Sequence, residues 1–293
     1  MGLAITFGAY AAGAVVGLGV HRGGPRLQRS WPVYLRLQLV ATAALLGLFS
    51  AWRLTEFRQI VAPILIAAVG WLLFAAARLI RGNRSTGLVQ LEGWAAFPNG
   101  TFWVLPVAGG LLGPAASMLA ALTNAVYAIP NAVCIHMMRR DAPIPQRRST
   151  SWMDQSMLLA VLVGVLLHLV GPAPAASHWV LTVAGPVLAF IGAALYMGSV
   201  FHPHNASVER AAPDYWRWLF LTGVRIVFLL VIAAVTGSTT VAVVAVLSAL
   251  GPPAFNPPQQ AVLYGYRSGV VMVAVRWGWV FLPVGLALAL VLR

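Results

Sequence analysis

Long apolar stretches separated by short polar loops run through the whole chain. A helix needs about 20 mostly apolar residues to cross a lipid bilayer. Stretches of that kind lie at 3–20, 32–51, 59–80, 88–112, 115–138, 155–172, 178–200, 214–235, 239–265 and 269–291. The second is the least regular, because it carries Arg36 and Gln38 in its first half. The pattern predicts an all-α polytopic membrane protein with about ten transmembrane helices.

Composition supports the same class. Of the 293 residues, 60% are hydrophobic and only 9% are charged, whereas soluble domains are nearer half apolar and a quarter charged. A soluble core of this size could not bury so much apolar surface. The net charge of +13 would suggest nucleic acid in a soluble protein, but no basic domain exists to hold one. The expected partner is the lipid bilayer, and no nucleic acid.

The arginines are concentrated in every second loop, which predicts how the chain is oriented in the membrane. Basic loop residues stay on the cytoplasmic side of a membrane. The loops after odd-numbered stretches, with their flanks, hold Arg22, Arg26, Arg29, Arg78, Arg81, Arg84, Arg139, Arg140, Arg147, Arg148, Arg210, Arg217 and Arg267. The alternate loops hold only Arg53 and Arg58, and Arg293 stands at the end. We therefore expect a multi-pass protein of the cell (cytoplasmic) membrane with both termini outside.

The polar loop at 139–153 divides the chain into two halves of five apolar stretches each. We expect residues 1–138 to form a first five-helix repeat, 139–153 a cytoplasmic linker, and 154–293 a second five-helix repeat. An odd number of spans in each half makes the halves face opposite ways. Inverted repeats of this kind are common in secondary transporters.

The fourth stretch of each half is interrupted by proline. The first carries Pro98-Asn99-Gly100, and the second carries Gly251-Pro252-Pro253 followed by Asn256-Pro257-Pro258. Proline removes a backbone donor and clashes with the preceding turn. Each interruption may be read as a simple kink in a membrane helix, or as a broken helix whose free backbone groups line a wet cavity. Matching positions in opposed halves favour two broken helices at a substrate site.

The interrupted segments resemble those of a known family. Asn99, Phe102 and Leu105-Pro106, followed by Gly113, resemble the first crossover segment of the auxin efflux carrier family. Its second crossover is similar to the segment 253–265, with Pro253, Gln260-Ala261 and Tyr264-Gly265, and its seventh span resembles Pro186-x-x-Ala189-x-x-Gly192-x-x-Leu195-x-x-Gly198.

The resemblance implies a fold like that of the bile-acid sodium symporters. Two broken crossover helices, four and nine, would cross at the membrane centre, and a scaffold domain would move against them. It also implies export or exchange of small organic anions. Thr101 and Val104 stand where the family usually has glycine, and the bulky Trp103 lies between them, so the substrate does not carry over.

The polar groups at the two breaks are the candidate substrate-binding residues. An amide side chain can bond both a freed backbone group and a substrate oxygen, which points to Asn99, Asn256 and Gln260, with Thr101 beside them. Helix N-termini after the breaks carry partial positive charge. Arg225, an in-span cation, would add to it and favour a carboxylate. The alternative for Arg225 is a structural pair with a backbone carbonyl.

Other in-span polar groups have weaker functional readings. Glu92 is a candidate for proton or sodium coupling, or an interfacial residue that reaches the inner surface. Asn124 and Tyr127 are better explained by helix–helix hydrogen bonds, and His168 by a structural role. No cluster with metal-ligand spacing occurs, and we expect neither a metal nor a cofactor.

The sequence carries no nucleophile motif, zinc motif or nucleotide-binding loop, so we expect no enzyme. The expected function is a secondary transporter (permease) that moves a small organic anion, such as a carboxylate, by alternating access. The alternatives are a multi-pass enzyme acting on a lipid-linked substrate, and a channel. A homodimer is compatible with this plan.

The arginine distribution predicts that Arg26 and Arg147 face the cytoplasm. In a Cys134→Ala background, Arg26→Cys and Arg147→Cys should resist an impermeant thiol reagent on intact cells and react after lysis. Arg58→Cys should react in intact cells and is the matched control. Strong labelling of position 147 in intact cells would contradict the orientation.

Overall fold

The computed structural model describes residues 2–22, 37, 41, 44–54, 60–81, 97–140, 156–200, 212–252 and 269–293. Within them lie ten helical elements and no β-strand: α1 (Gly2–Arg22), α3 (Val61–Arg81), η2 (Gly100–Val104), α5 (Leu105–Leu112), α6 (Pro114–Arg140), α8 (Ser156–Val170), α9 (Ala176–Val200), α10 (Ala212–Val235), α11 (Thr239–Leu250) and α13 (Gly269–Leu292). Residues 44–52 are helical too. The predicted all-α class is confirmed.

The helix bounds follow the apolar stretches of the sequence. The six longest helices contain 21 to 27 residues, which corresponds to roughly 30–40 Å at 1.5 Å per residue. Two stretches have non-helical residues at their prolines, and residues 82–96 and 253–268 on the far side of them lie outside the described ones. The chain is non-helical at 97–99 before η2, and α11 ends at Leu250, before Pro252. α6 extends to Arg140, into the predicted linker, whose remaining residues lie outside the described ones.

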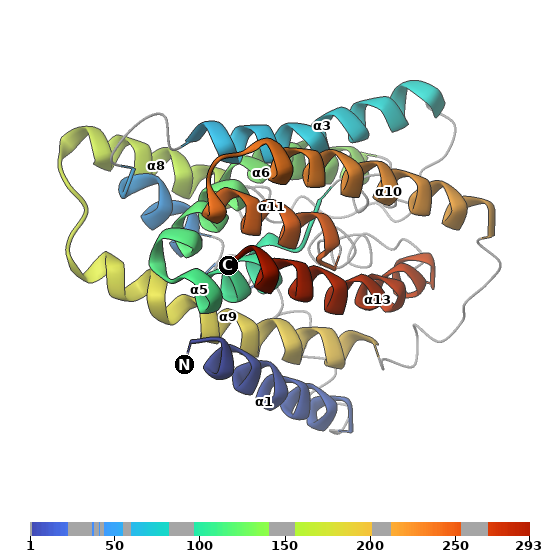
Figure 1. The fold of residues 1–293 in the computed structure, drawn as a ribbon, viewed down its shortest axis with the longest axis horizontal. Helices are drawn as coiled ribbons and strands as arrows, with labels where there is room; N and C mark the ends of the chain where they lie inside the picture. The colour runs from blue at the N-terminus through green and yellow to red at the C-terminus, as the bar shows by residue number, and fades with distance from the viewer. Residues whose placement is uncertain are drawn as a thin grey trace.

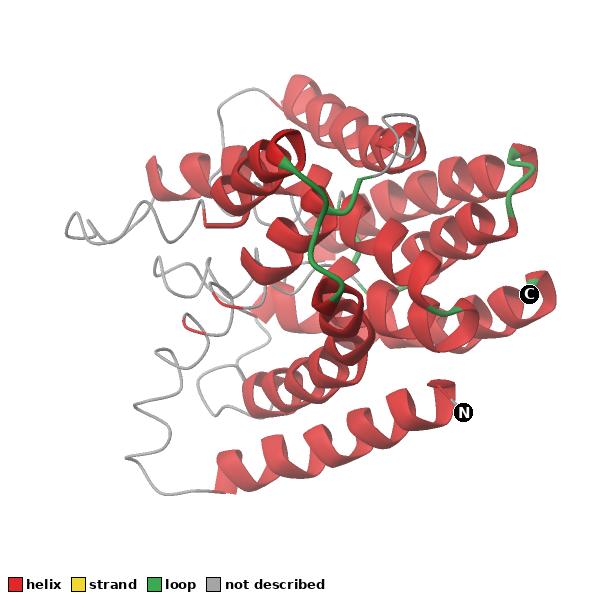
Figure 2. Cartoon of the chain, turned by 90° about the vertical axis from the view of Figure 1, so that its left-hand side faces the viewer, coloured by secondary structure: helices red, strands yellow, loops and turns green. Residues whose placement is uncertain are grey.

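The helices run nearly side by side along the long axis of the molecule. α11 and α5 lie between α3 and α10 on one side and α9 and α1 on the other (Figure 1). Both ends of the chain lie at the same end of the bundle (Figures 1 and 2). Short loops connect the described helices at several turns (Figure 2).

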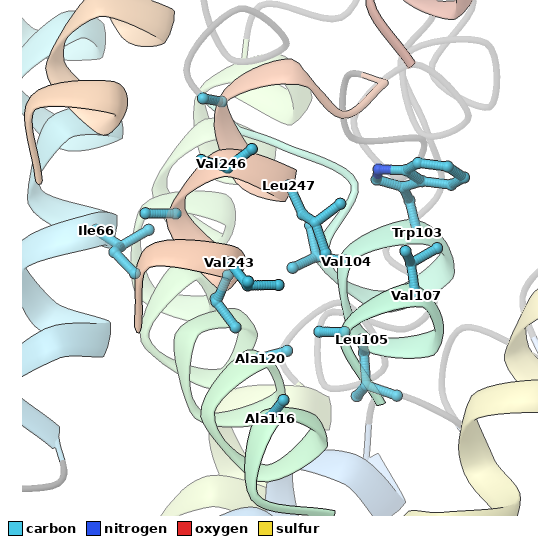
Figure 3. Packing of buried hydrophobic residues seen from close by; sticks show 14 of the residues in the cluster. Ile66, Trp103, Val104, Leu105, Val107, Ala116, Ala120, Val243, Val246 and Leu247 are labelled. Carbon is cyan, nitrogen blue, oxygen red and sulfur yellow. The ribbon is translucent and has the colours of Figure 1, made fainter. Parts of the chain in front are cut away.

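The short helices next to the breaks form the centre of the core. Every residue of η2 is buried, as is every residue of α11 from Ala242 to Leu250. Val243 and Leu247 of α11 face Val104 and Leu105, with Ala116 and Ala120 of α6 beside them (Figure 3). An α-helix that is apolar and buried on all sides lies at the centre of its bundle rather than on its surface.

Glycines allow two pairs of helices to approach closely. On α1, Gly13 and Gly17 lie against the backbone of Phe190 and Ala194 of α9. On α8, Gly164 lies against the Leu48 carbonyl of the 44–52 helix. Small residues one turn apart let helix backbones come together and are typical of helix pairs in lipid.

One helical stretch within the described residues, Gly2–Val20, is long and apolar enough to cross a membrane by itself. A further seven apolar helical stretches in that part of the chain are 10–17 residues long, among them Val61–Leu73, Leu158–Val170 and Val280–Leu292. A single qualifying helix near the N-terminus is weak evidence, because a signal sequence has the same properties.

A methyl group at Gly13 should separate α1 from α9. The Cβ of Gly13→Ala would lie 3.0 Å from the Phe190 Cα and closer still to its carbonyl, and overpacking of this kind destabilises by about 1–3 kcal/mol. Gly19→Ala is the matched control, because the described structure has nothing within 4 Å of its Cβ, and alanine favours helix by about 1 kcal/mol. In purified protein, the thermal unfolding midpoint should fall for Gly13→Ala and hold or rise for Gly19→Ala. Equal midpoints would show that the close approach is not required.

Candidate functional site

The first break is organised by the amide of Asn99. Its Oδ1 accepts a hydrogen bond from the Phe102 N–H at 3.1 Å, so it caps the start of η2. Its backbone carbonyl accepts from the N–H groups of Trp103 and Val104, at 3.1 and 3.0 Å. An N-cap side chain supplies an acceptor that the first helical turn lacks. The oxygen of Asn99 therefore serves the backbone, and its NH₂ group is the part left to donate to a ligand.

The second break meets the first directly. α11 ends at Leu250, and Gly251 is extended, with φ −69° and ψ 158°. The Asn99 N–H donates to the Pro252 carbonyl at 2.9 Å. This bond joins two interrupted segments that are 153 residues apart in sequence (252 − 99). The structure thus places residue 99 beside the start of the second break.

Thr101 and α6 form a polar contact next to the first break. The Asn124 Nδ2 donates to Thr101 Oγ1 at 2.7 Å. One turn further along α6, the Tyr127 hydroxyl donates to the Ile66 carbonyl of α3 at 3.2 Å. The expected helix–helix hydrogen bonds of Asn124 and Tyr127 are confirmed, and Asn124 reaches a predicted site residue through one of them.

Arg225 is buried at the end of α11. Its side chain is 1% exposed and is the largest fully buried one among the described residues. Nη2 lies 3.4 Å from the Ala249 carbonyl. The last carbonyls of a helix carry partial negative charge. Arg225 therefore makes the backbone-carbonyl contact that was one of its two expected roles.

Helix ends contribute to the electrostatics of the site. At the first break η2 presents its positive N-terminus, as expected. At the second break α11 ends with its negative C-terminus, and the N-terminus expected after this break lies outside the described residues. Arg225 offsets that negative end, so only part of its charge acts on anything else nearby.

Three buried polar atoms around α10, α11 and η2 have no hydrogen-bond partner among the described residues: Trp103 Nε1, Thr222 Oγ1 and Ser248 Oγ. Ser248 precedes Ala249, the residue that Arg225 contacts, and Thr222 lies one turn before Arg225 on α10. Buried polar groups are nearly always hydrogen-bonded in native proteins. These three atoms are therefore candidate contacts for a polar ligand.

The indole of Trp103 packs directly against the second break. A Cβ on Gly251 would lie 2.6 Å from its Cδ1 and 2.9 Å from its Nε1, so the indole fits against the second break because residue 251 is glycine. The ring also lies 6.0 Å from that of Tyr10, whose hydroxyl donates to the Phe102 carbonyl. The sequence alone shows Trp103 only as a bulky residue in the segment that resembles the first crossover.

The structure brings together three predicted site residues, Asn99, Thr101 and Arg225, around the end of α11 and the start of η2. Glu92, Asn256 and Gln260 lie outside the described residues. No group of three metal-ligating side chains occurs in the part of the chain that the structure describes. His168 on α8 lies 3.3 Å from the Trp52 carbonyl, a contact between helices that suits its expected structural role.

A cavity of about 300 Å³ lies apart from these residues. It opens between the start of α1, the end of α5, the start of α6 and the first half of α9. Pro106, one turn beyond Thr101, is one of its walls, but Asn99, Thr101 and Arg225 do not line it.

The Oδ1 of Asn99 caps η2 and its NH₂ group is the candidate ligand donor, so two substitutions can separate these roles. Asn99→Ala removes the cap and should lower the stability of the folded protein by about 0.5–2 kcal/mol. Asn99→Asp keeps an acceptor for the Phe102 N–H and should stay near the parent in thermal unfolding midpoint. Equal loss of stability in both variants would contradict the capping role.

No family model matches this chain, and no curated protein matches it.

Proposed function

We propose that the chain is an integral membrane protein and that its described helices cross the bilayer. Large apolar side chains are exposed along whole helix faces, as at Leu162, Leu166 and Leu169 of α8, which are 53%, 62% and 76% exposed. Soluble monomers rarely expose continuous apolar faces, and lipid removes the need to bury them. The six long helices match the roughly 30 Å thickness of a bilayer core.

We infer that residues 1–138 and 154–293 form two inverted repeats. If the two halves are equivalent, α1 corresponds to α8, and the 44–52 helix corresponds to α9. The α1–α9 contact then has its counterpart in the α8 contact with residues 44–52. The α3–α10 contact corresponds to itself under the same equivalence.

We propose that the protein is a secondary transporter of a small organic anion in the cytoplasmic membrane. The observation that carries this proposal is the Asn99–Pro252 hydrogen bond, which joins two helix interruptions inside a buried core. Irregular backbone at such depth is tolerated where it is buried in protein or lines a water-filled cavity. In transporters it forms substrate sites.

The substrate carboxylate would bind beside this bond. The Asn99 Nδ2, Trp103 Nε1 and Ser248 hydroxyl would donate to it, and the N-terminus of η2 and Arg225 would supply positive potential. Thr101, held by Asn124, would contribute to the same wall. Asn256 and Gln260 follow Pro252 in sequence and would complete the site from the second break. Glu92 would couple transport to protons or sodium.

The direct test is transport by purified protein in lipid vesicles. Uptake of small aromatic and aliphatic carboxylates should be saturable, should respond to an imposed proton or sodium gradient, and should exceed that of the matching neutral amides. Absence of carboxylate flux under every gradient, with folded protein present, would contradict the function.

Two variants with preserved folding test the site. Asn99→Asp keeps the cap but replaces the donor with a negative charge, and Arg225→Met replaces the buried charge by an apolar side chain of similar length, a change that is often neutral for stability. Each removes a hydrogen bond to a charged group, worth roughly 1.5–3 kcal/mol, so apparent affinity for the anion should fall about tenfold or more. Neutral analogues should be affected less. Thr123→Val, buried on α6 with its hydroxyl bonded to the Leu119 carbonyl, is the control.

A further inference from the structure

The cavity between α1, α5, α6 and α9 has a different character from the two breaks. Its walls are mostly apolar, among them Ile5, Val183 and Pro186. No charged side chain is found among the described residues that line it. A volume of about 300 Å³ is at the lower limit of sites for small molecules. The walls therefore suit the apolar body of a small ligand.

One polar side chain in this cavity lacks a partner. Ser117 is 4% exposed and lines the cavity, and its hydroxyl makes no hydrogen bond to any described residue. Thr6, by contrast, donates to the Gly2 carbonyl at 3.0 Å. Buried hydroxyl groups are usually satisfied, so Ser117 provides a donor for a bound molecule.

The start of α6 gives the same wall a positive potential. α6 begins at Pro114, and the preceding Gly113 has no side chain with which to cap it. The Ser117 N–H donates to the Gly113 carbonyl at 3.2 Å, while the N–H groups before it have no acceptor within the helix. A helix N-terminus of this kind favours a negatively charged group.

We propose that this cavity is a second binding site, for a small amphipathic monocarboxylate. The carboxylate lies at Ser117 and the first turn of α6, and the hydrocarbon body lies against Ile5, Val183 and Pro186. The ligand fills the space between α1 and α9 on one side and α5 and α6 on the other. Its binding therefore stabilises this arrangement of the four helices, and it does not require the site at the breaks.

Octanoate and octan-1-ol are matched probes, because they share a chain length and differ in the head group. Saturable binding to the full-length protein in lipid nanodiscs should be measured by equilibrium binding of the labelled compounds, with the thermal midpoint as a second readout. Octanoate should bind more tightly than octanol and raise the midpoint, because a ligand that binds only the folded state stabilises it.

Two variants close the cavity and one removes the donor. Gly185→Leu has room, since a Cβ there lies 3.6 Å from the Pro106 Cα, and Ile5→Trp starts from a side chain that is 51% exposed. Both should abolish saturable binding of either probe. Ser117→Ala should weaken octanoate about tenfold, as expected for a lost bond to a charged group, and leave octanol unchanged. Ser50→Ala makes the same change at a buried serine elsewhere and should have no effect.

Several outcomes would overturn this site. They are absence of saturable binding, unchanged binding in both closed variants, and equal affinity for the two probes. Asn99→Asp and Arg225→Met weaken only the proposed site at the breaks, so the octanoate binding that Ser117→Ala weakens should persist in both variants. If they abolish its binding, the ligand lies at the breaks and the second site is refuted. If they abolish transport alone, the two sites are distinct.

Discussion

The hydrogen bond between the Asn99 N–H and the Pro252 carbonyl lies where η2 begins and just beyond the end of α11, inside the bundle. Backbone groups at such a point have lost their helical partners, and an unsatisfied buried group costs about 1–3 kcal/mol. The bond satisfies one backbone group on each side. The Asn99 side chain also accepts from the Phe102 N–H, and Arg225 lies 3.4 Å from the Ala249 carbonyl. The pairing of the breaks, the buried cation and the cap therefore have a common physical cause.

Close packing around this point depends on small residues. The last turn of α11 and the start of η2 meet because Gly251 leaves room for the indole of Trp103. Further out, Gly13 and Gly17 bring α1 against α9. In the proposed membrane setting the hydrophobic effect would supply little attraction between helices, so shape and hydrogen bonds would decide which helices pair. The contacts of α5 and α11 with their neighbours place both helices at the centre of the bundle.

The polar groups at the centre serve the structure, and under the proposed function they would also bind the ligand. Asn99 uses its oxygen for the helix and keeps its NH₂ group, and Arg225 offsets the negative end of α11. Trp103, Thr222 and Ser248 keep buried polar atoms without a partner among the described residues. Under the proposed function these backbone contacts would hold the site in place, which is what selective binding of a small ligand requires.

Much of the fold could be predicted from the sequence, because helix position depends on local pattern. Apolar runs of about 20 residues set where the helices lie. Pro98 marks where η2 begins and Pro252 where α11 has ended, since proline acts on its own turn. Asn99, Thr101 and Arg225 could be found as polar residues in apolar surroundings. Asn124 and Tyr127 were correctly assigned to contacts between helices.

Only the tertiary structure decided how these local elements combine. The meeting of residues 99 and 252 depends on packing between helices far apart in sequence. That the negative end of α11 lies beside Arg225 depends on the direction of α11 and on its packing against α10. The roles of Trp103 and Ser248, and the cavity beside Ser117, arise from non-local contacts. Local sequence fixes where a helix begins and ends, whereas the partners of its side chains depend on the neighbours that the fold brings to it.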